Sequence, residues 1–147
     1  MTDRPDLAAM FLPLTRALID AERPVLAEHD LSMWAYGVLL ALEEGPLRTQ
    51  AALAQSIGAD KTRIIGVLDD LQRRGLIERV PDPADRRARL LSLTAEGRRL
   101  RDSAQAGIRR REERLLARLP EGDREGFLRA LCALAALPPP RDHGPPS

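Results

Sequence analysis

The sequence predicts a mainly α-helical fold built around a winged helix-turn-helix, with about six helices and a short β-hairpin. Three observations lead to this prediction. Residues 49–75 hold two short helical patterns separated by a glycine-containing turn. Residues 76–93 read as two strands around an arginine-rich loop, and apolar helical patterns occupy both ends of the chain. Hydrophobic residues make up 44% of the chain and aromatic residues only 3%, so we expect a core of Leu, Ala, Ile and Val.

The first two helices are predicted from apolar spacing and from capping residues. Apolar residues recur at roughly helical spacing over residues 6–28, where Pro24 is expected to kink a helix that continues through it. A second helix is expected from the N-cap Ser32 to about Glu44, with Gly45-Pro46 as its stop.

The next two helices form the predicted helix-turn-helix. Thr49 is placed to cap a short helix that ends at Gly58, and Asp60 is placed to cap the following helix, which Gly75 closes. That following helix has an inward stripe at spacings of three and four, formed by Ile64, Val67, Leu68 and Leu71. Its other face carries polar, basic and small residues, namely Lys61, Thr62, Arg63, Ile65, Gly66 and Asp69. Two interpretations fit this face: a helix that enters a DNA major groove, or an ordinary amphipathic helix with a solvated side.

A short hairpin with an arginine-rich tip follows. Residues 76–80 and 89–93 are predicted strands on either side of the loop PDPADRRA, in which the two prolines favour a turn. An arginine at a hairpin tip can enter a narrow minor groove, and we expect Arg87 in that role. A carboxylate two residues earlier can orient a guanidinium, so Asp85 is expected to support Arg87, with Arg86 or Arg89 on phosphates.

The C-terminal part is predicted to be helical as far as residue 137. Thr94 is placed to cap a long fifth helix that runs to about Leu119, and Pro120 begins a sixth that continues to Leu137. The sixth helix has a wide apolar face formed by Phe127, Leu128, Leu131, Leu134, Ala135 and Leu137. Such a face needs to be covered, either by the first helix or by a second subunit. Residues 138–147 lack apolar periodicity and are predicted to be disordered.

Charge is distributed unevenly along the chain. The net charge is only +1, but residues 1–47 carry −5 and residues 48–114 carry +6. A basic middle segment is typical of a protein that binds a polyanion. Among the 23 basic residues Lys61 is the only lysine. Arginine suits phosphates and guanine edges, although codon bias in a GC-rich genome explains the same preference.

Several function classes lack support in the sequence. No apolar run approaches the roughly 20 residues of a transmembrane helix and no signal peptide opens the chain, so a cytoplasmic location is the default expectation. The lone Cys132 excludes an intrachain disulfide and a multi-cysteine metal site. The chain has no glycine-rich phosphate loop, no metal-binding H-E-x-x-H and no G-x-S-x-G, so we expect neither an enzyme nor a cofactor.

The segment LAQSIGADKTRIIGVLDDLQRRGLIERVPDPADRRARLLSLTAEG resembles the MarR family of bacterial transcriptional regulators. The specific part is the combination of the helix exit Leu71–Arg79, the Asp-x-x-Asp-Arg-Arg loop and the Leu-Thr-x-x-Gly that follows. The resemblance spans roughly residues 5–137. It implies a homodimer that reads a pseudo-palindromic operator through consecutive major grooves. It also implies four regions: an N-terminal dimerisation helix (1–31), a winged helix-turn-helix DNA-binding lobe (32–97), C-terminal dimerisation helices (94–137) and the tail (138–147).

Carried over to this chain, the resemblance implies that the fourth helix contacts DNA through Lys61, Thr62, Arg63 and Ile65, and the loop through Arg87 supported by Asp85. Gly66, Arg86 and Arg89 are added from the residue patterns above, so the expected DNA-binding residues are Lys61, Thr62, Arg63, Ile65, Gly66, Asp85, Arg86, Arg87 and Arg89. Gly66 departs from the polar or basic residue that members often carry there, so base recognition at this position is reduced or different.

Many regulators of this type are released from DNA by a small aromatic ligand. A candidate ligand pocket lies around the junction of the first two helices and is formed by Met10, His29, Met33, Trp34 and Tyr36, with core packing as the alternative role of these residues. Cys132 is expected to be a small packed hydrophobe rather than a redox sensor.

A second function stays open from the sequence alone. Gly66 and the acidic pair Asp69-Asp70 are compatible with a ligand- or protein-binding winged-helix dimer that has lost specific DNA binding. The arginines of the loop favour the DNA-binding regulator, more as a repressor than as an activator.

Overall fold

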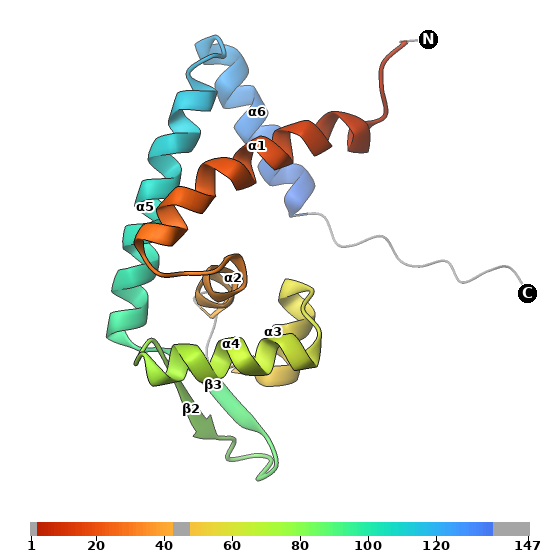
Figure 1. Ribbon diagram of the computed structural model, residues 1–147. Helices are drawn as coiled ribbons and strands as arrows, with labels where there is room; N and C mark the ends of the chain where they lie inside the picture. Colours follow the sequence, from red (N-terminus) through yellow and green to blue (C-terminus); the bar gives the residue numbers. More distant parts are fainter. Residues whose placement is uncertain (1–2, 43–47, 137–147) are drawn as a thin grey trace, which may run out of the picture. The chain divides into compact units, whose positions relative to one another are not determined.

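The computed structural model describes residues 3–42 and 48–136, and its elements follow the predicted order (Figure 1). Contacts between residues divide the chain into two compact units, Met1–Arg111 and Glu112–Ser147. The elements are α1 (Leu7–Glu28), α2 (Met33–Ala41), β1 (Arg48–Thr49), α3 (Gln50–Ile57), α4 (Lys61–Arg73), β2 (Ile77–Pro81), β3 (Arg89–Leu93), α5 (Ala95–Leu116) and α6 (Glu121–Ala135). The prediction of a mainly helical fold with a β-hairpin is confirmed. None of the described helices is long and apolar enough to cross a bilayer.

α1 is a single helix that contains both Pro13 and Pro24. A proline removes the hydrogen bond to the carbonyl four residues earlier, which belongs to Ala9 or Asp20 in this helix. Both of these residues are exposed, so water can solvate the freed carbonyls. α1 therefore continues through Pro24, and its last turn buries Val25 and Leu26.

Four of the predicted N-caps are confirmed by side-chain hydrogen bonds to a backbone amide three residues later. The oxygen accepts the bond at 2.7–3.2 Å in each case, in Ser32, Thr49, Asp60 and Thr94. These caps satisfy amides that a helix start leaves without a partner. α2 ends at Ala41, three residues before the predicted Glu44, and the predicted stop at Gly45-Pro46 lies outside the described residues.

The sheet has one strand more than predicted. β2 and β3 pair antiparallel in register Ile77↔Leu93 to Pro81↔Arg89, and β1 pairs with the other edge of β3. β1 is only two residues long and carries no alternating pattern, so periodicity could not reveal it. Pro81 belongs to β2, at the end of the strand nearest the loop and on the edge of the sheet, where its missing N–H is tolerated.

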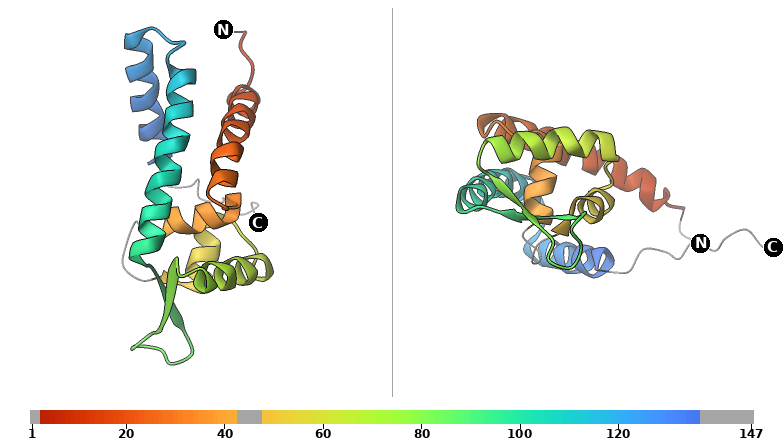
Figure 2. Two further views of the ribbon diagram at one scale, coloured as in Figure 1. Left: turned by 60° about the vertical axis from the view of Figure 1, so that its left-hand side comes forward. Right: turned by 90° about the horizontal axis from the view of Figure 1, so that it is seen from below.

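The core of the first unit lies between α2, α3, α4 and the sheet. Its largest fully buried side chains come from all of these elements and include Leu39, Leu53, Ile64, Leu68, Leu71, Ile77 and Leu91. α4 and the hairpin lie at the same end of this unit, and the loop between β2 and β3 projects beyond the helix (Figures 1 and 2). Burying one face of α4 leaves its opposite face exposed.

Close packing fixes the start of α5 against the start of the hairpin. The Leu76 carbonyl accepts a hydrogen bond from the Thr94 amide at 3.1 Å. A Cβ added to Gly97 would lie 2.0 Å from the same carbonyl oxygen, closer than any real contact. Gly97 is therefore required by the close approach of two backbones, and it holds the hairpin at a set position on α5.

The second unit contains α6 and the end of α5. α6 has no buried residue, and its exposed apolar side chains include Leu128, Leu131 and Leu134. Cys132 is also exposed, contrary to the prediction of a packed side chain, because the rest of this unit does not cover the apolar face. Within the unit, Arg124 pairs with Glu113. Leu137 and the predicted tail lie outside the described residues.

Candidate nucleic-acid interface

The turn between α3 and α4 is formed by Gly58, Ala59 and Asp60. Gly58 has φ +69°, a left-handed conformation that glycine adopts without strain, and the Ala59 amide donates to the Ala54 carbonyl at 3.0 Å. Asp60 then caps α4 through the Arg63 amide at 2.7 Å. The amides that remain free at the start of α4, together with the helix dipole, favour an anion at this end.

α4 has one buried face and one open face. Ile64, Leu68 and Leu71 are buried, as the stripe predicts. The five residues of α4 predicted to contact DNA are all exposed: Lys61, Thr62, Arg63, Ile65 and Gly66. Ile65 is a large apolar residue that is 45% exposed on this face. Gly66 has open space around it, because a Cβ added there would meet nothing within 4 Å. The open face thus offers basic donors, one apolar contact and room for close approach.

The acidic residues of α4 are paired with arginines. Asp69 accepts a bond from Arg79 on β2 at 2.7 Å, which joins α4 to the hairpin. Asp70 pairs with Arg73 at 3.3 Å and with Arg74 at 3.7 Å. The arginine partners offset the repulsion that these two carboxylates would otherwise exert on a phosphate backbone.

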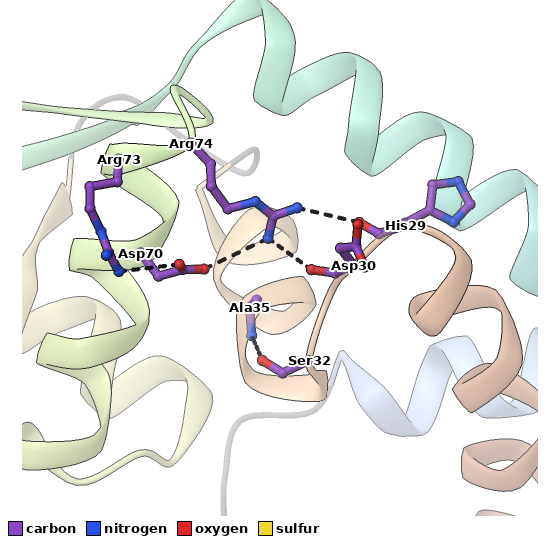
Figure 3. Close-up of polar contacts among 7 residues, drawn as sticks. All are labelled: His29, Asp30, Ser32, Ala35, Asp70, Arg73 and Arg74. Atoms are coloured by element: carbon purple, nitrogen blue, oxygen red, sulfur yellow. Dashed lines mark hydrogen bonds and ion pairs between the residues drawn. The ribbon is translucent and has the colours of Figure 1, made fainter.

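Arg74, at the end of α4, forms hydrogen bonds with the junction of α1 and α2. Its guanidinium donates to the Asp30 carbonyl at 2.8 Å and to the His29 carbonyl at 3.4 Å (Figure 3). Asp30 has φ +52°, so the chain turns sharply there. The spacing of Asp70 and Arg74 indicates their ion pair in the sequence, but no local pattern reveals the contact with the carbonyls 44 and 45 residues away.

The loop between β2 and β3 is shaped by two carboxylates. Asp82 accepts from the Ala84 amide at 2.9 Å, and Asp85 accepts from the Arg87 amide at 3.0 Å. Backbone bonds close the loop, from Asp82 to the Ala88 carbonyl and from Ala88 to the Asp85 carbonyl, both at 3.1 Å. The predicted bond from Asp85 to the Arg87 guanidinium is replaced by this bond to its backbone, because an Asp side chain readily caps an amide two residues later. Asp85 therefore sets the turn from which Arg87 projects.

The arginines of the loop face solvent. Arg86, Arg87 and Arg89 are exposed, and in the described part of the chain none of them forms an ion pair. Arg89 begins β3, opposite Pro81, and so sits at the base of the loop. These three guanidinium groups, at the tip and base of a projecting hairpin, are available to phosphates or to a groove.

The predicted ligand-pocket residues lie in different environments. Met10 and Met33 are exposed, whereas Tyr36 is part of the buried core. His29 bridges α1 to α5, with Nδ1 donating to the Val25 carbonyl at 2.7 Å and Nε2 at 2.9 Å from the Ser103 hydroxyl. Trp34 is half-buried, and its ring lies 5.6 Å from the guanidinium carbon of Arg63. Sequence reasoning missed this contact, because nothing in the spacing of residues 34 and 63 links them.

Known proteins are similar to this chain over the segment that contains the helix-turn-helix and the first strand of the hairpin. A model of the MarR family matches residues 29–88, which include α2, α3, α4, β2 and most of the loop. The transcriptional regulator HosA of Escherichia coli O111:H- is 33% identical over 99 residues, which are 67% of this chain and 73% of HosA. The putative transcriptional regulatory protein for the hcr operon of Thauera aromatica is 28% identical over 102 residues, which are 69% of this chain and 61% of that protein.

Solved structures are similar over most of the chain. The transcriptional repressor CouR bound to a 23-mer DNA duplex is 29% identical, with a TM-score of 0.75 over 88% of this chain and 92% of CouR. The PcaV transcriptional regulator from Streptomyces coelicolor, in complex with its natural ligand, is 31% identical, with a TM-score of 0.65 over 91% of this chain and 97% of PcaV.

Proposed function

Because this chain belongs to the MarR family of transcriptional regulators, we propose that it acts in the cytoplasm as a homodimeric repressor of a pseudo-palindromic operator. α4 enters the major groove and the arginine loop enters the adjacent minor groove. The observation that carries the proposal is the placement of the open face of α4 and the exposed loop arginines at one end of the first unit. The DNA-bound structure of CouR, a similar protein, adds support.

Each side chain has a proposed role in this complex. Arg63 and Thr62 contact base edges, Ile65 contacts a thymine methyl, and Gly66 allows the backbone of α4 to approach. Arg87 inserts into the minor groove from the turn that Asp85 shapes. Lys61, Arg86 and Arg89 bind phosphates, which set the register and orientation of the protein on the duplex.

The homodimer is proposed from apolar surface at both ends of the chain. Leu7, Met10, Phe11 and Leu12 on α1 are between 37% and 54% exposed, and α6 exposes three leucines of its own. Such side chains in water are typical of an interface with another chain. A second copy that covers them would also present two helix-turn-helix lobes to two half-sites.

We also propose that a small aromatic ligand releases the protein from its operator. PcaV, a similar protein, was solved with its natural ligand. In this chain Met33 and Trp34 give the start of α2 an apolar and aromatic surface that such a ligand can contact. A panel of phenolic and aromatic acids, added to the protein–operator complex, tests this release. At least one of them should lower the fraction of DNA that is bound. If none of them does, release by an aromatic ligand is contradicted.

The DNA-binding role is tested with Arg87→Ala and a matched control. Duplexes that the protein enriches from a random library serve as the operator. Arg87→Ala should weaken binding by about 5- to 150-fold, the range for loss of a groove-reading arginine. Arg109→Ala removes the same charge from an exposed position on α5 and should leave affinity within about twofold. Equal affinities for the two variants would contradict the role of the loop.

A further inference from the structure

The start of the recognition helix carries an arginine that rests on an aromatic ring. The guanidinium carbon of Arg63 lies 5.6 Å from the centroid of the Trp34 ring, within the distance at which a cation and an indole attract. Tryptophan is the best ring for this interaction. The contact joins α2 to the part of α4 that is proposed to read bases.

Both partners are held in place by the ends of their helices. Trp34 follows the N-cap of α2, where the Ser32 hydroxyl accepts from the Ala35 amide at 3.0 Å (Figure 3). The Arg63 amide donates to the Asp60 carboxylate at 2.7 Å, which fixes the first turn of α4. α2 and α4 pack directly against each other, and both contribute buried side chains to the core, Leu39 from α2 and Leu68 from α4. The ring therefore meets the guanidinium from a rigid support.

The other end of α4 is tied to the same stretch of chain. Arg74 donates to the carbonyls of His29 and Asp30, a few residues before Trp34 (Figure 3). The segment from His29 to Trp34 thus contacts the recognition helix at its first turn and just beyond its last. A displacement of this segment would reach both ends of α4.

A guanidinium on a ring keeps its hydrogen-bonding capacity. Stacking uses the flat face of the group, while its N–H donors point outward in the plane. Trp34 is half-buried and Arg63 is exposed, so the guanidinium lies over the ring while the side chain stays accessible to water and to DNA. An arginine restrained in this way loses less rotamer freedom when it binds a guanine edge or a phosphate.

We propose that Trp34 is a positioning residue for DNA recognition, whose indole ring holds Arg63 in the conformation that contacts the operator. This inference rests on the proposed function, because it requires Arg63 to contact DNA. It assigns Trp34 a role in operator affinity that is separate from any ligand pocket.

A double-mutant cycle on operator affinity tests the proposal. Trp34→Leu should weaken binding by about 2- to 5-fold, the range for an exposed cation–ring contact, and Trp34→Phe should weaken it less because a ring remains. In an Arg63→Ala background, Trp34→Leu should have no further effect. An equal loss in both backgrounds, or no loss in either, would overturn the proposal. A purely structural role for Trp34 would give the equal loss.

Fluorescence of the DNA-free protein separates the contact from DNA binding. Trp34 is the only tryptophan in the chain, so its emission reports on this ring alone. Arg63→Ala should change the emission of Trp34, whereas Lys61→Ala, an exposed basic residue one position after the cap, should not. Unchanged emission in both variants would contradict the contact. A wild-type protein that binds no operator would defeat the proposed function and this role together, even with the emission change present.

Discussion

At the scale of single residues, the exposed positions of α4 and the loop differ in their surroundings, and their proposed roles follow from these differences. Ile65 is an apolar side chain in water, and Arg87 projects from a turn that Asp85 shapes through the backbone. Gly66 is the most informative of these positions, because its conformation is helical and nothing crowds it. A glycine inside a helix lowers the stability of the helix, so its presence indicates that the absence of a side chain serves a function at this position.

Gly66→Ala should therefore separate stability from binding. The free energy of unfolding should rise by about 0.5–1 kcal/mol, because alanine has a higher helix propensity and meets no neighbour. Operator affinity should fall, because a Cβ would stand between the backbone and the DNA. Urea denaturation and anisotropy titration measure the two effects. A Gly66→Ala variant with lower stability would contradict the open surroundings of Gly66. A more stable variant with unchanged operator affinity would contradict the close approach of the α4 backbone to DNA.

At the scale of elements, the ion pair between Asp69 and Arg79 joins α4 to β2 on the side that faces DNA in the proposed complex. Arg79→Gln should weaken operator binding by about 2- to 5-fold, because it leaves the Asp69 charge without its partner near the phosphates. Asp69→Asn added to Arg79→Gln should recover part of the loss. Anisotropy titrations of the single and double variants measure this, and a double variant weaker than Arg79→Gln alone would exclude a charge effect.

The packing of α5 on the hairpin gives a second prediction for elements. Gly97→Ala should lower stability by about 1–3 kcal/mol, because its Cβ would overlap the Leu76 carbonyl oxygen and force the backbone apart. Gly122→Ala is the matched control, a helical glycine of α6 with nothing within 4 Å, and should not lower stability. Thermal unfolding compares the two. Equal melting temperatures would show that the close approach does not constrain the fold.

The elements also show where sequence reasoning succeeds. Helix starts were predictable because Ser32, Thr49, Asp60 and Thr94 each act within three residues of themselves. The exposed face of α4 followed from the spacing of its apolar residues. Contacts between distant segments were not predictable: the pairing of β1 with β3, the bonds of Arg74 to carbonyls far away, and the ring contact of Arg63 depend on packing. Local sequence patterns do not identify partners that lie far apart in the chain.

At the scale of the whole molecule, the proposed function requires two copies of the chain on one operator. Light scattering should give twice the 16.3 kDa mass of the chain at micromolar concentration. Leu131→Glu on α6 and Met10→Glu on α1 should each lower this mass, because a charge would be buried in the interface. A wild-type mass of one chain, with operator binding retained, would contradict the homodimer.

Salt dependence is the second property of the whole complex. Lys61, Arg86 and Arg89 would supply about six phosphate contacts from two protomers, so affinity should fall by about 10³-fold between about 50 mM and about 200 mM salt. Titrations at several salt concentrations measure the slope. A slope near zero would mean that phosphates contribute little.

The most direct test of sequence-specific DNA binding is an anisotropy titration of the purified protein against DNA upstream of its own gene. It uses a scrambled competitor duplex and two salt concentrations. We expect saturable binding that survives the competitor and weakens at the higher salt concentration. The same titration is repeated with duplexes selected from a random library. If binding to both kinds of duplex is weak and is abolished by the scrambled competitor, the protein is not a sequence-specific DNA-binding regulator.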